Sequence, residues 1–144
     1  MKENKKILIT GVAGFIGFSL ARRFLQDGFS IVGLDNINNY YSKKIKYDRL
    51  RILKKFNKFK FHKIDIRKKF DLYNTLKKYK FNTVYHLAAQ AGVRHSIIKP
   101  DDYLSNNLVG FFNILDFCRL IKIKHFIFAS TSSVYGLNNN LPFE

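Results

Sequence analysis

Residues 7–35 constrain the fold of this chain more than any other stretch. They open with a short apolar run, and a turn with three glycines follows at once: Gly11, Gly14 and Gly17. Apolar residues then recur at helical spacing as far as Gly28, and a second apolar run ends on Asp35. This order of strand, glycine turn, helix, strand and acid predicts a βαβ unit with two parallel strands.

Each glycine and the acid have a physical reason for their positions. Gly11 permits a tight turn, Gly14 lets the backbone approach a phosphate, and Gly17 lets the helix lie close to the strand. The helix N-terminus presents free N–H groups and partial positive charge to an anion. Asp35 can accept hydrogen bonds from ribose hydroxyls and repel a 2′-phosphate. The unit predicts a dinucleotide site that prefers NAD, the alternative being a glycine-rich turn in another doubly wound protein.

The rest of the chain continues the alternation of strands and helices. Further strands are predicted over residues 59–66, 83–87 and 125–130. The helices between them are predicted after residue 42, over 70–80, and from Pro100 to about Ile121. The order predicts an α/β fold with a parallel sheet, helices on both faces, and ligands at the carboxyl ends of the strands.

Apolar spacing also predicts which faces of these helices are buried. The first of them should bury Ile45, Leu50, Leu53 and Phe56. The long helix should bury Leu104, Leu108, Phe111, Leu115 and Cys118. Cys118 is therefore expected to be buried and unreactive. His86 is interpreted as a packed histidine, because no cysteine or acid accompanies it at metal-ligand spacing, so no metal site is predicted.

The formal net charge of +16 raises the alternative of a nucleic-acid-binding protein. The charge pattern argues against nucleic acid as a partner, because the basic residues are mostly lysine and are scattered along the chain. Lys, Asn, Ile, Phe and Tyr supply 70 of the 144 residues, a bias typical of A/T-rich codons. Positive potential that attracts an anionic nucleotide substrate is a third explanation.

Composition predicts a single cytoplasmic domain. Residues 1–144 suffice to bury one core, and no apolar run approaches the roughly 20 residues of a membrane span. The N-terminal lysines precede no apolar signal core, so no secretion signal is predicted.

The glycine spacing G-x-x-G-x-x-G, within T-G-x-x-G-F-I-G, resembles that of the extended short-chain dehydrogenase/reductase superfamily, which includes sugar-nucleotide epimerases and dehydratases. Later blocks narrow the resemblance to the UDP-glucuronate 4-epimerase family: D-N-I-N-N-Y-Y at 35–41, A-A-Q-A-G-V-R at 88–94, N-L-V-G-F at 107–111 and S-T-S-S-V-Y-G-L-N at 130–138. Families acting on UDP-glucose or UDP-N-acetylhexosamines stay open as alternatives. The resemblance implies a Rossmann-type doubly wound sheet that binds NAD.

The resemblance also implies roles for individual residues around the cofactor. Gly11, Gly14, Phe15, Ile16 and Gly17 would meet the pyrophosphate. Asp35 and Asn36 would hold the ribose, and Asp65 and Ile66 would border the adenine, although Asp65 could equally be a plain turn aspartate. Four residues would run beside the cofactor, with Asn107 supporting their loop: Leu87, Ala88, Ala89 and Gln90.

For the sugar substrate, the resemblance implies oxidation at C4 to a 4-keto intermediate and reduction from the other face. Thr131 would hydrogen-bond the reacting hydroxyl, and Ser132 and Ser133 would face the substrate carboxylate. Three residues would lie near the nucleotide sugar: Gly92, Val93 and Arg94. A polar turn at a strand end is the alternative interpretation of residues 130–133.

The chain departs from the family's pattern at the catalytic pair. The family's Tyr-x-x-x-Lys would lie beyond Glu144, and the substrate-binding region would be missing as well. Two local matches, Tyr40 with Lys44 and Tyr73 with Lys77, are rejected because they follow the wrong strands. We therefore expect a C-terminally incomplete epimerase, inactive alone and a homodimer at full length. A non-catalytic dinucleotide-binding fragment is the alternative.

Overall fold

The computed structural model describes residues 6–138 and 140–143. Within them a parallel sheet has the strand order β3-β2-β1-β4-β5. Its strands are β1 (Lys6–Thr10), β2 (Ser30–Asp35), β3 (Phe59–Lys63), β4 (Phe81–His86) and β5 (His125–Phe128). The sequence order reverses direction at β1, which is the switch point where a doubly wound sheet forms its ligand crevice.

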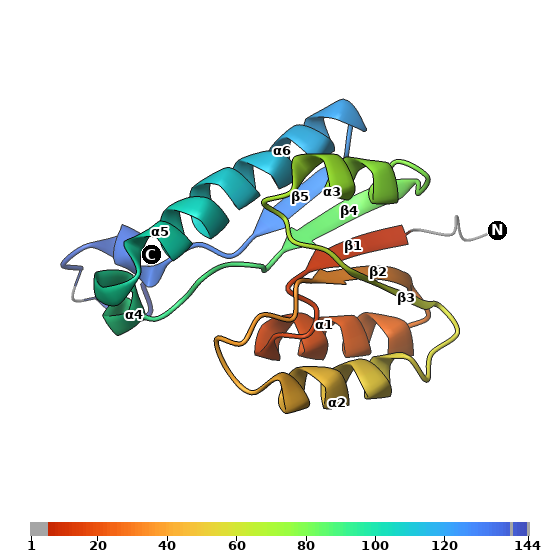
Figure 1. Ribbon diagram of the computed structural model, residues 1–144, viewed down its shortest axis with the longest axis horizontal. Helices are drawn as coiled ribbons and strands as arrows, with labels where there is room; N and C mark the ends of the chain where they lie inside the picture. The colour runs from red at the N-terminus through yellow and green to blue at the C-terminus, as the bar shows by residue number, and fades with distance from the viewer. Residues whose placement is uncertain (1–5, 139, 144) are drawn as a thin grey trace.

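Helices cover both faces of the sheet (Figure 1). The helical elements are α1 (Phe15–Gln26), α2 (Lys43–Leu53), α3 (Lys69–Leu76), α4 (Val93–Ile98), α5 (Pro100–Tyr103), the π-helix η1 (Leu104–Gly110), α6 (Phe111–Leu120) and the 3₁₀ helix η2 (Ser132–Tyr135). Helices α1 and α2 lie on one face, and α3 and α6 lie on the other. The predicted α/β, Rossmann-type fold is confirmed.

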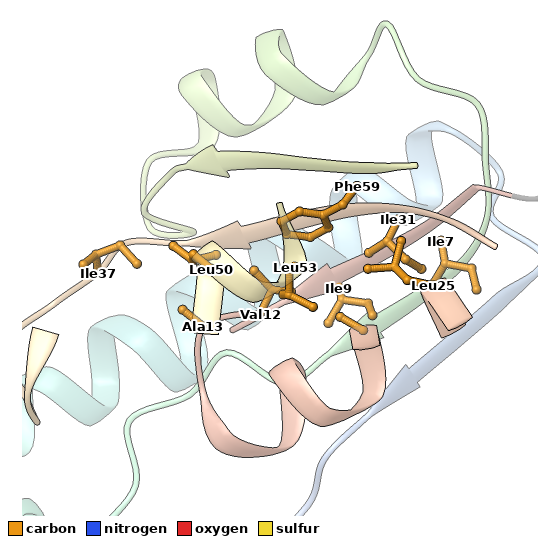
Figure 2. Packing of buried hydrophobic residues seen from close by; sticks show 11 residues of the cluster. Ile7, Ile9, Val12, Ala13, Leu25, Ile31, Ile37, Leu50, Leu53 and Phe59 are labelled. Carbon is orange, nitrogen blue, oxygen red and sulfur yellow. The ribbon is translucent and has the colours of Figure 1, made fainter. Parts of the chain in front are cut away.

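Two apolar clusters, one on each face, hold the layers together. In β1, Ile7 and Ile9 point toward α1 and α2, whereas Leu8 points toward α3 and α6. Figure 2 shows the first cluster, in which Leu50 and Leu53 of α2 lie against the same face. Burial on both faces explains why β1 is a continuous apolar run instead of an alternating one. Each fully buried side chain contributes about 1.5–3 kcal/mol.

The predicted long helix is interrupted, and most of its predicted buried stripe was wrong. Leu104, Leu108 and Leu115 are 56%, 63% and 43% exposed. The buried face of α6 consists of Asn113, Ile114, Phe117 and Cys118. The wider turns of η1 rotate the residues before α6 relative to those within it, so a stripe extrapolated at 3.6 residues per turn misses the buried face. Cys118 is buried, as predicted.

Helix α2 differs from its prediction at one position of consequence. Leu50 and Leu53 are buried as expected, but Ile45 is exposed and Lys46 is buried in its place. Lys46 precedes Leu50 by four residues, so it lies on the same helix face.

Two short helices were not predicted, and β3 ends earlier than expected. Helices α4 and η2 span too few residues to show a period. Strand β3 ends at Lys63, and the chain beyond it turns at Asp65, whose carboxylate accepts a hydrogen bond from the Arg67 N–H (3.0 Å). Of the N-terminal segment in which no secretion signal is predicted, residues 1–5 lie outside the described residues.

Candidate dinucleotide site

The glycine turn after β1 is packed too closely for side chains. Gly11 has a φ of +68°, and a Cβ there would lie 2.9 Å from the backbone of Leu87. A Cβ on Gly17 would lie 2.2 Å from the Gly11 carbonyl oxygen. Both positions therefore require glycine. This close approach places the N-terminus of α1, with its free N–H groups, at the carboxyl end of β1.

Asp35 lies at the end of β2 with its carboxylate held by the backbone. Oδ2 accepts a hydrogen bond from the Ala13 N–H (3.1 Å), and Oδ1 accepts one from the Ile37 N–H (2.8 Å). Each oxygen keeps a further lone-pair site, because an ionised carboxylate accepts about four hydrogen bonds. Two acceptors beside a helix N-terminus suit two ribose hydroxyls next to a pyrophosphate.

A buried polar contact joins the ends of β1 and β4. The Thr10 Oγ1 accepts hydrogen bonds from the N–H groups of Leu87 and Ala88, both at 3.1 Å. Its hydroxyl proton is thus directed to Nδ1 of His86, 2.8 Å away, which must be unprotonated to accept it. Burial lowers the pKa of His86 to about 4, which keeps the ring neutral. His86 is the packed histidine that its sequence context indicates.

The segment after β4 is held by an amide pair. Asn107 in η1 donates to the Gln90 carbonyl (2.9 Å), and its Oδ1 accepts from the Gln90 N–H (2.8 Å). Asn107 lies within the π-helix η1, and π-helical turns recur at functional sites. The supporting role expected of Asn107 is consistent with these two bonds.

These elements enclose one pocket at the carboxyl ends of the central strands. Nine of the residues expected at the cofactor line it: Gly11, Gly14, Asp35, Asn36, Ile66, Leu87, Ala88, Ala89 and Gln90. The glycine turn, the end of β2 and the segment after β4 thus meet around one space. Their individual roles stay predictions.

The other expected cofactor residues lie near the pocket without lining it. Gly17 is buried under the turn, and Phe15 and Ile16 are exposed at the start of α1. Asp65 lines a neighbouring hollow, where its carboxylate accepts hydrogen bonds from Nε and Nη2 of Arg67. This pairing lowers the pKa of Asp65. Arg67 pairs with both carboxylate oxygens, and both interpretations of Asp65 stay open.

The residues expected at the substrate lie farther along the sheet edge. Thr131, Ser132 and Ser133 follow β5 and are exposed, and Thr131 Oγ1 accepts the Ser133 N–H (3.1 Å) as the cap of η2. Gly92, Val93 and Arg94 are also exposed, at the start of α4. The structure does not bring these two groups into the pocket of Asp35, and their roles stay predictions.

Sequence reasoning missed a polar group on the outer wall of the pocket. Asn38, Tyr41 and Lys46 all line it together with Asp35. Lys46 Nζ lies 2.8 Å from Asn38 Oδ1 and 3.7 Å from Asp35 Oδ1. The available signal was a lysine on the buried face of α2, four residues before Leu50.

The two local Tyr-x-x-x-Lys matches lie where the sequence analysis put them. Tyr40 is in the loop after β2, with its ring 5.1 Å from that of His95. Tyr73 is on α3, with its ring 6.2 Å from that of Phe117 in α6. Tyr73 therefore faces the groove between two helices and not the pocket.

Comparison with known proteins decides the family. A family model described as GDP-mannose 4,6 dehydratase matches residues 8–144. The chain belongs to this family. The resemblance to NAD-dependent epimerases and dehydratases is thereby confirmed.

Curated relatives support the same grouping. Protein CapI of Staphylococcus aureus is 47% identical over 138 residues, which are 96% of this chain and 41% of the relative. A UDP-glucuronate 4-epimerase of Thermodesulfobacterium geofontis (strain OPF15) is 42% identical over 90% of this chain and 40% of its own length. The chain thus spans about two-fifths of the length of the relatives it matches.

A solved structure matches closely. The UDP-glucuronic acid 4-epimerase of Bacillus cereus, in complex with UDP-glucuronic acid and NAD, superimposes with a TM-score of 0.84 at 36% identity and covers 94% of this chain and 43% of its own. The UDP-Glc/GlcNAc 4-epimerase of Campylobacter jejuni superimposes with a TM-score of 0.83 at 32% identity and covers 94% of this chain and 40% of its own.

No helix among the described residues has the length and apolar character to cross a membrane. Among residues 6–138 and 140–143, no group of three or more His, Cys, Asp or Glu side chains could hold a metal ion.

Proposed function

We propose that this chain is the NAD-binding part of a UDP-sugar 4-epimerase, and that its substrate is UDP-glucuronate. In this proposal residues 1–144 form one NAD-binding domain, and a chain of the relatives' length supplies the rest of the sugar site. The proposal includes the cytoplasmic location that the sequence predicts.

The observation that carries the proposal is the carboxylate of Asp35, held by the backbone N–H of Ala13 in the glycine turn. In the proposal this hydrogen bond joins Asp35, which binds the ribose, to the glycine turn, which binds the pyrophosphate. Gly11 and Gly17 leave no room for a Cβ, so the turn is shaped for a backbone surface next to phosphate. These features fit an adenosine diphosphate with free ribose hydroxyls.

The chain's own residues would bind and orient the two ligands. The first N–H groups of α1 stabilise the pyrophosphate charge, and Asp35 accepts the ribose hydroxyls. Thr10 holds the start of the segment after β4 and Asn107 holds Gln90, so in the proposal the wall beside the nicotinamide is preorganised. When bound, NAD supplies a hydride acceptor for C4 of the sugar and returns the hydride to the other face.

UDP-glucuronate is favoured as substrate by three adjacent hydroxyls at the end of β5. In the proposal Thr131 holds the reacting hydroxyl, and Ser132 and Ser133 donate to the carboxylate. A carboxylate brought into a partly dry site needs such donors to replace lost water. The Campylobacter jejuni neighbour, named for UDP-Glc/GlcNAc, keeps a related UDP-hexose as the second candidate.

Homodimerisation at full length is also part of the proposal. Helix α6 and the preceding η1 present an apolar surface that the described residues leave uncovered: Leu104, Leu108, Phe112 and Leu115. A contiguous exposed apolar surface of this kind is typical of an interface. In the proposal the chain alone does not turn over. Tyr73 faces α6, and Tyr40, although it lines the pocket, follows β2 on the side of Asp35, where the adenosine would lie.

The substrate assignment is tested in a chain extended to the length of its relatives. Ser132→Ala combined with Ser133→Ala should raise the KM for UDP-glucuronate much more than that for UDP-glucose. Each lost hydrogen bond to a charged acceptor costs roughly 1.5–3 kcal/mol. The measurement is the ratio of kcat/KM for the two sugars in wild type and double variant.

Thr131→Ala serves as the matched control, since it should lower kcat for both sugars alike. An unchanged ratio in the double variant would return the substrate to an unspecified UDP-hexose.

A further inference from the structure

Lys46 is a buried cation on the wall of the pocket. It is 5% exposed, whereas Lys43 and Lys44, on the preceding turn of α2, are exposed. Lysine is almost never fully buried unless its charge is paired. Here Nζ lies 3.7 Å from Asp35 Oδ1 and 2.8 Å from Asn38 Oδ1, with the Tyr41 ring centroid 4.8 Å away.

The partners of Lys46 fix where its ammonium lies. Asp35 cannot swing away, because both of its oxygens are held by backbone N–H groups. Asn38 belongs to the loop after β2 and lines the same pocket. The cation is therefore held beside the carboxylate, on the wall of the pocket that Asp35 also lines.

We propose that Lys46 is a specificity-determining residue, and that the Asp35–Lys46 pair, instead of Asp35 alone, sets the preference between NAD and NADP. This inference rests on the proposed function, in which the pocket holds NAD. The ammonium offsets part of the repulsion that Asp35 exerts on a 2′-phosphate. With the carboxylate removed, the ammonium becomes a ready partner for that phosphate.

The proposal makes opposite predictions for the two members of the pair. Asp35→Ser leaves room for a phosphate, and its hydroxyl can still accept a backbone N–H, so it should weaken NAD and strengthen NADP by roughly tenfold each. Adding Lys46→Met to Asp35→Ser should abolish the gain in NADP affinity. Lys46→Met alone should weaken NADP more than NAD, because Asp35 then acts without its counter-charge.

The experiment is calorimetric titration of the 144-residue chain and its variants with NAD and with NADP. Lys43→Met is the matched control: it removes the same charge from the same helix outside the pocket and should leave the ratio of the two dissociation constants unchanged. Lys46→Arg keeps the charge and should stay close to wild type. Thermal unfolding followed by circular dichroism establishes that each variant is folded.

The outcomes separate this inference from the proposed function. A wild-type chain that binds neither cofactor contradicts the proposed function itself. If the wild-type chain binds NAD, but the ratio of the dissociation constants for NADP and NAD is the same in Asp35→Ser and in the double variant, the role of Lys46 is overturned and the proposed function stands. If Asp35→Ser does not fold, the comparison of Lys46→Met with Lys46→Arg tests the inference. Equal ratios of the NADP and NAD dissociation constants in these two variants would overturn it.

Discussion

The sheet is built differently on the two sides of its central strand β1, the side of β2 and β3 and the side of β4 and β5. On one side, β2 is buried over nearly its whole length, and β3 lies under α2. On the other side, β5 is largely exposed, with Ile127 41% exposed. It pairs with β4 in the sheet, and aromatic contacts pack against it, among them Phe111 with Phe128, whose ring centroids lie 5.2 Å apart.

This difference separates the two halves of the proposed site. Gly11 and Asp35, on the side of β2, are held by backbone contacts within a closed core. Thr131, Ser132 and Ser133 follow the exposed strand β5 and make few contacts of their own. Cofactor binding should therefore depend on rigid packing, and substrate binding on residues that further structure must position.

The largest expected effect comes from comparing one glycine on each side. Gly17→Ala should cost about 4–5 kcal/mol or prevent folding, because its Cβ would lie 2.2 Å from a backbone oxygen. Gly136→Ala has no atom within 4 Å of the added Cβ and should cost about 1–3 kcal/mol through its backbone conformation alone. Urea unfolding monitored by circular dichroism measures both. Equal costs would erase the contrast between the sides.

A matched pair of isoleucines tests the contrast in packing. Ile9 of β1 and Ile127 of β5 flank Tyr85 of β4 at the same level of the sheet. Ile9→Ala should cost about 3–4 kcal/mol, since the side chain is fully buried. Ile127→Ala should cost about 1 kcal/mol, in proportion to its smaller buried area. A cost for Ile127→Ala equal to that for Ile9→Ala would show that β5 is covered in solution.

The smallest effect concerns His86, at the junction of the two sides. Its pKa is lowered to about 4 in the folded chain from the ordinary value of 6.5. Between these pH values the unfolded chain binds a proton that the folded chain does not. The contribution of neutral His86 to the free energy of unfolding is therefore fully present above pH 6.5. Its loss should lower that free energy by about 2–3 kcal/mol as the pH drops toward 4.

His86→Asn isolates this contribution, because Oδ1 of the asparagine can replace Nδ1 as the acceptor for Thr10. Urea unfolding of both proteins at several pH values gives the comparison. The loss of stability between pH 6.5 and 4 should be smaller in the variant, with the carboxylates contributing equally to both. Identical pH profiles would mean that His86 titrates normally.

The sequence alone determined the βαβ unit and the acid that ends it. Gly11 and Gly17 encode a backbone contact, and Asp35 lies at a strand end, so each prediction depended only on local spacing. The parallel sheet followed from the alternation of apolar strands and amphipathic helices, whose connections allow few arrangements. These features are local, and for that reason they could be read without coordinates.

Only the tertiary structure decided which of two apolar faces is buried and which polar residues meet. Leu104 and Leu108 are apolar and regularly spaced, yet η1 turns them outward while Ile114 is buried. Lys46 resembles the other lysines of α2 in sequence, but the packing of α2 against the sheet places it beside Asp35. The family resemblance implied that Asn107 supports the loop of Gln90, but the two hydrogen bonds between them, 17 residues apart, are seen only in the structure. Such contacts depend on the rotation and docking of whole helices, which local spacing does not specify.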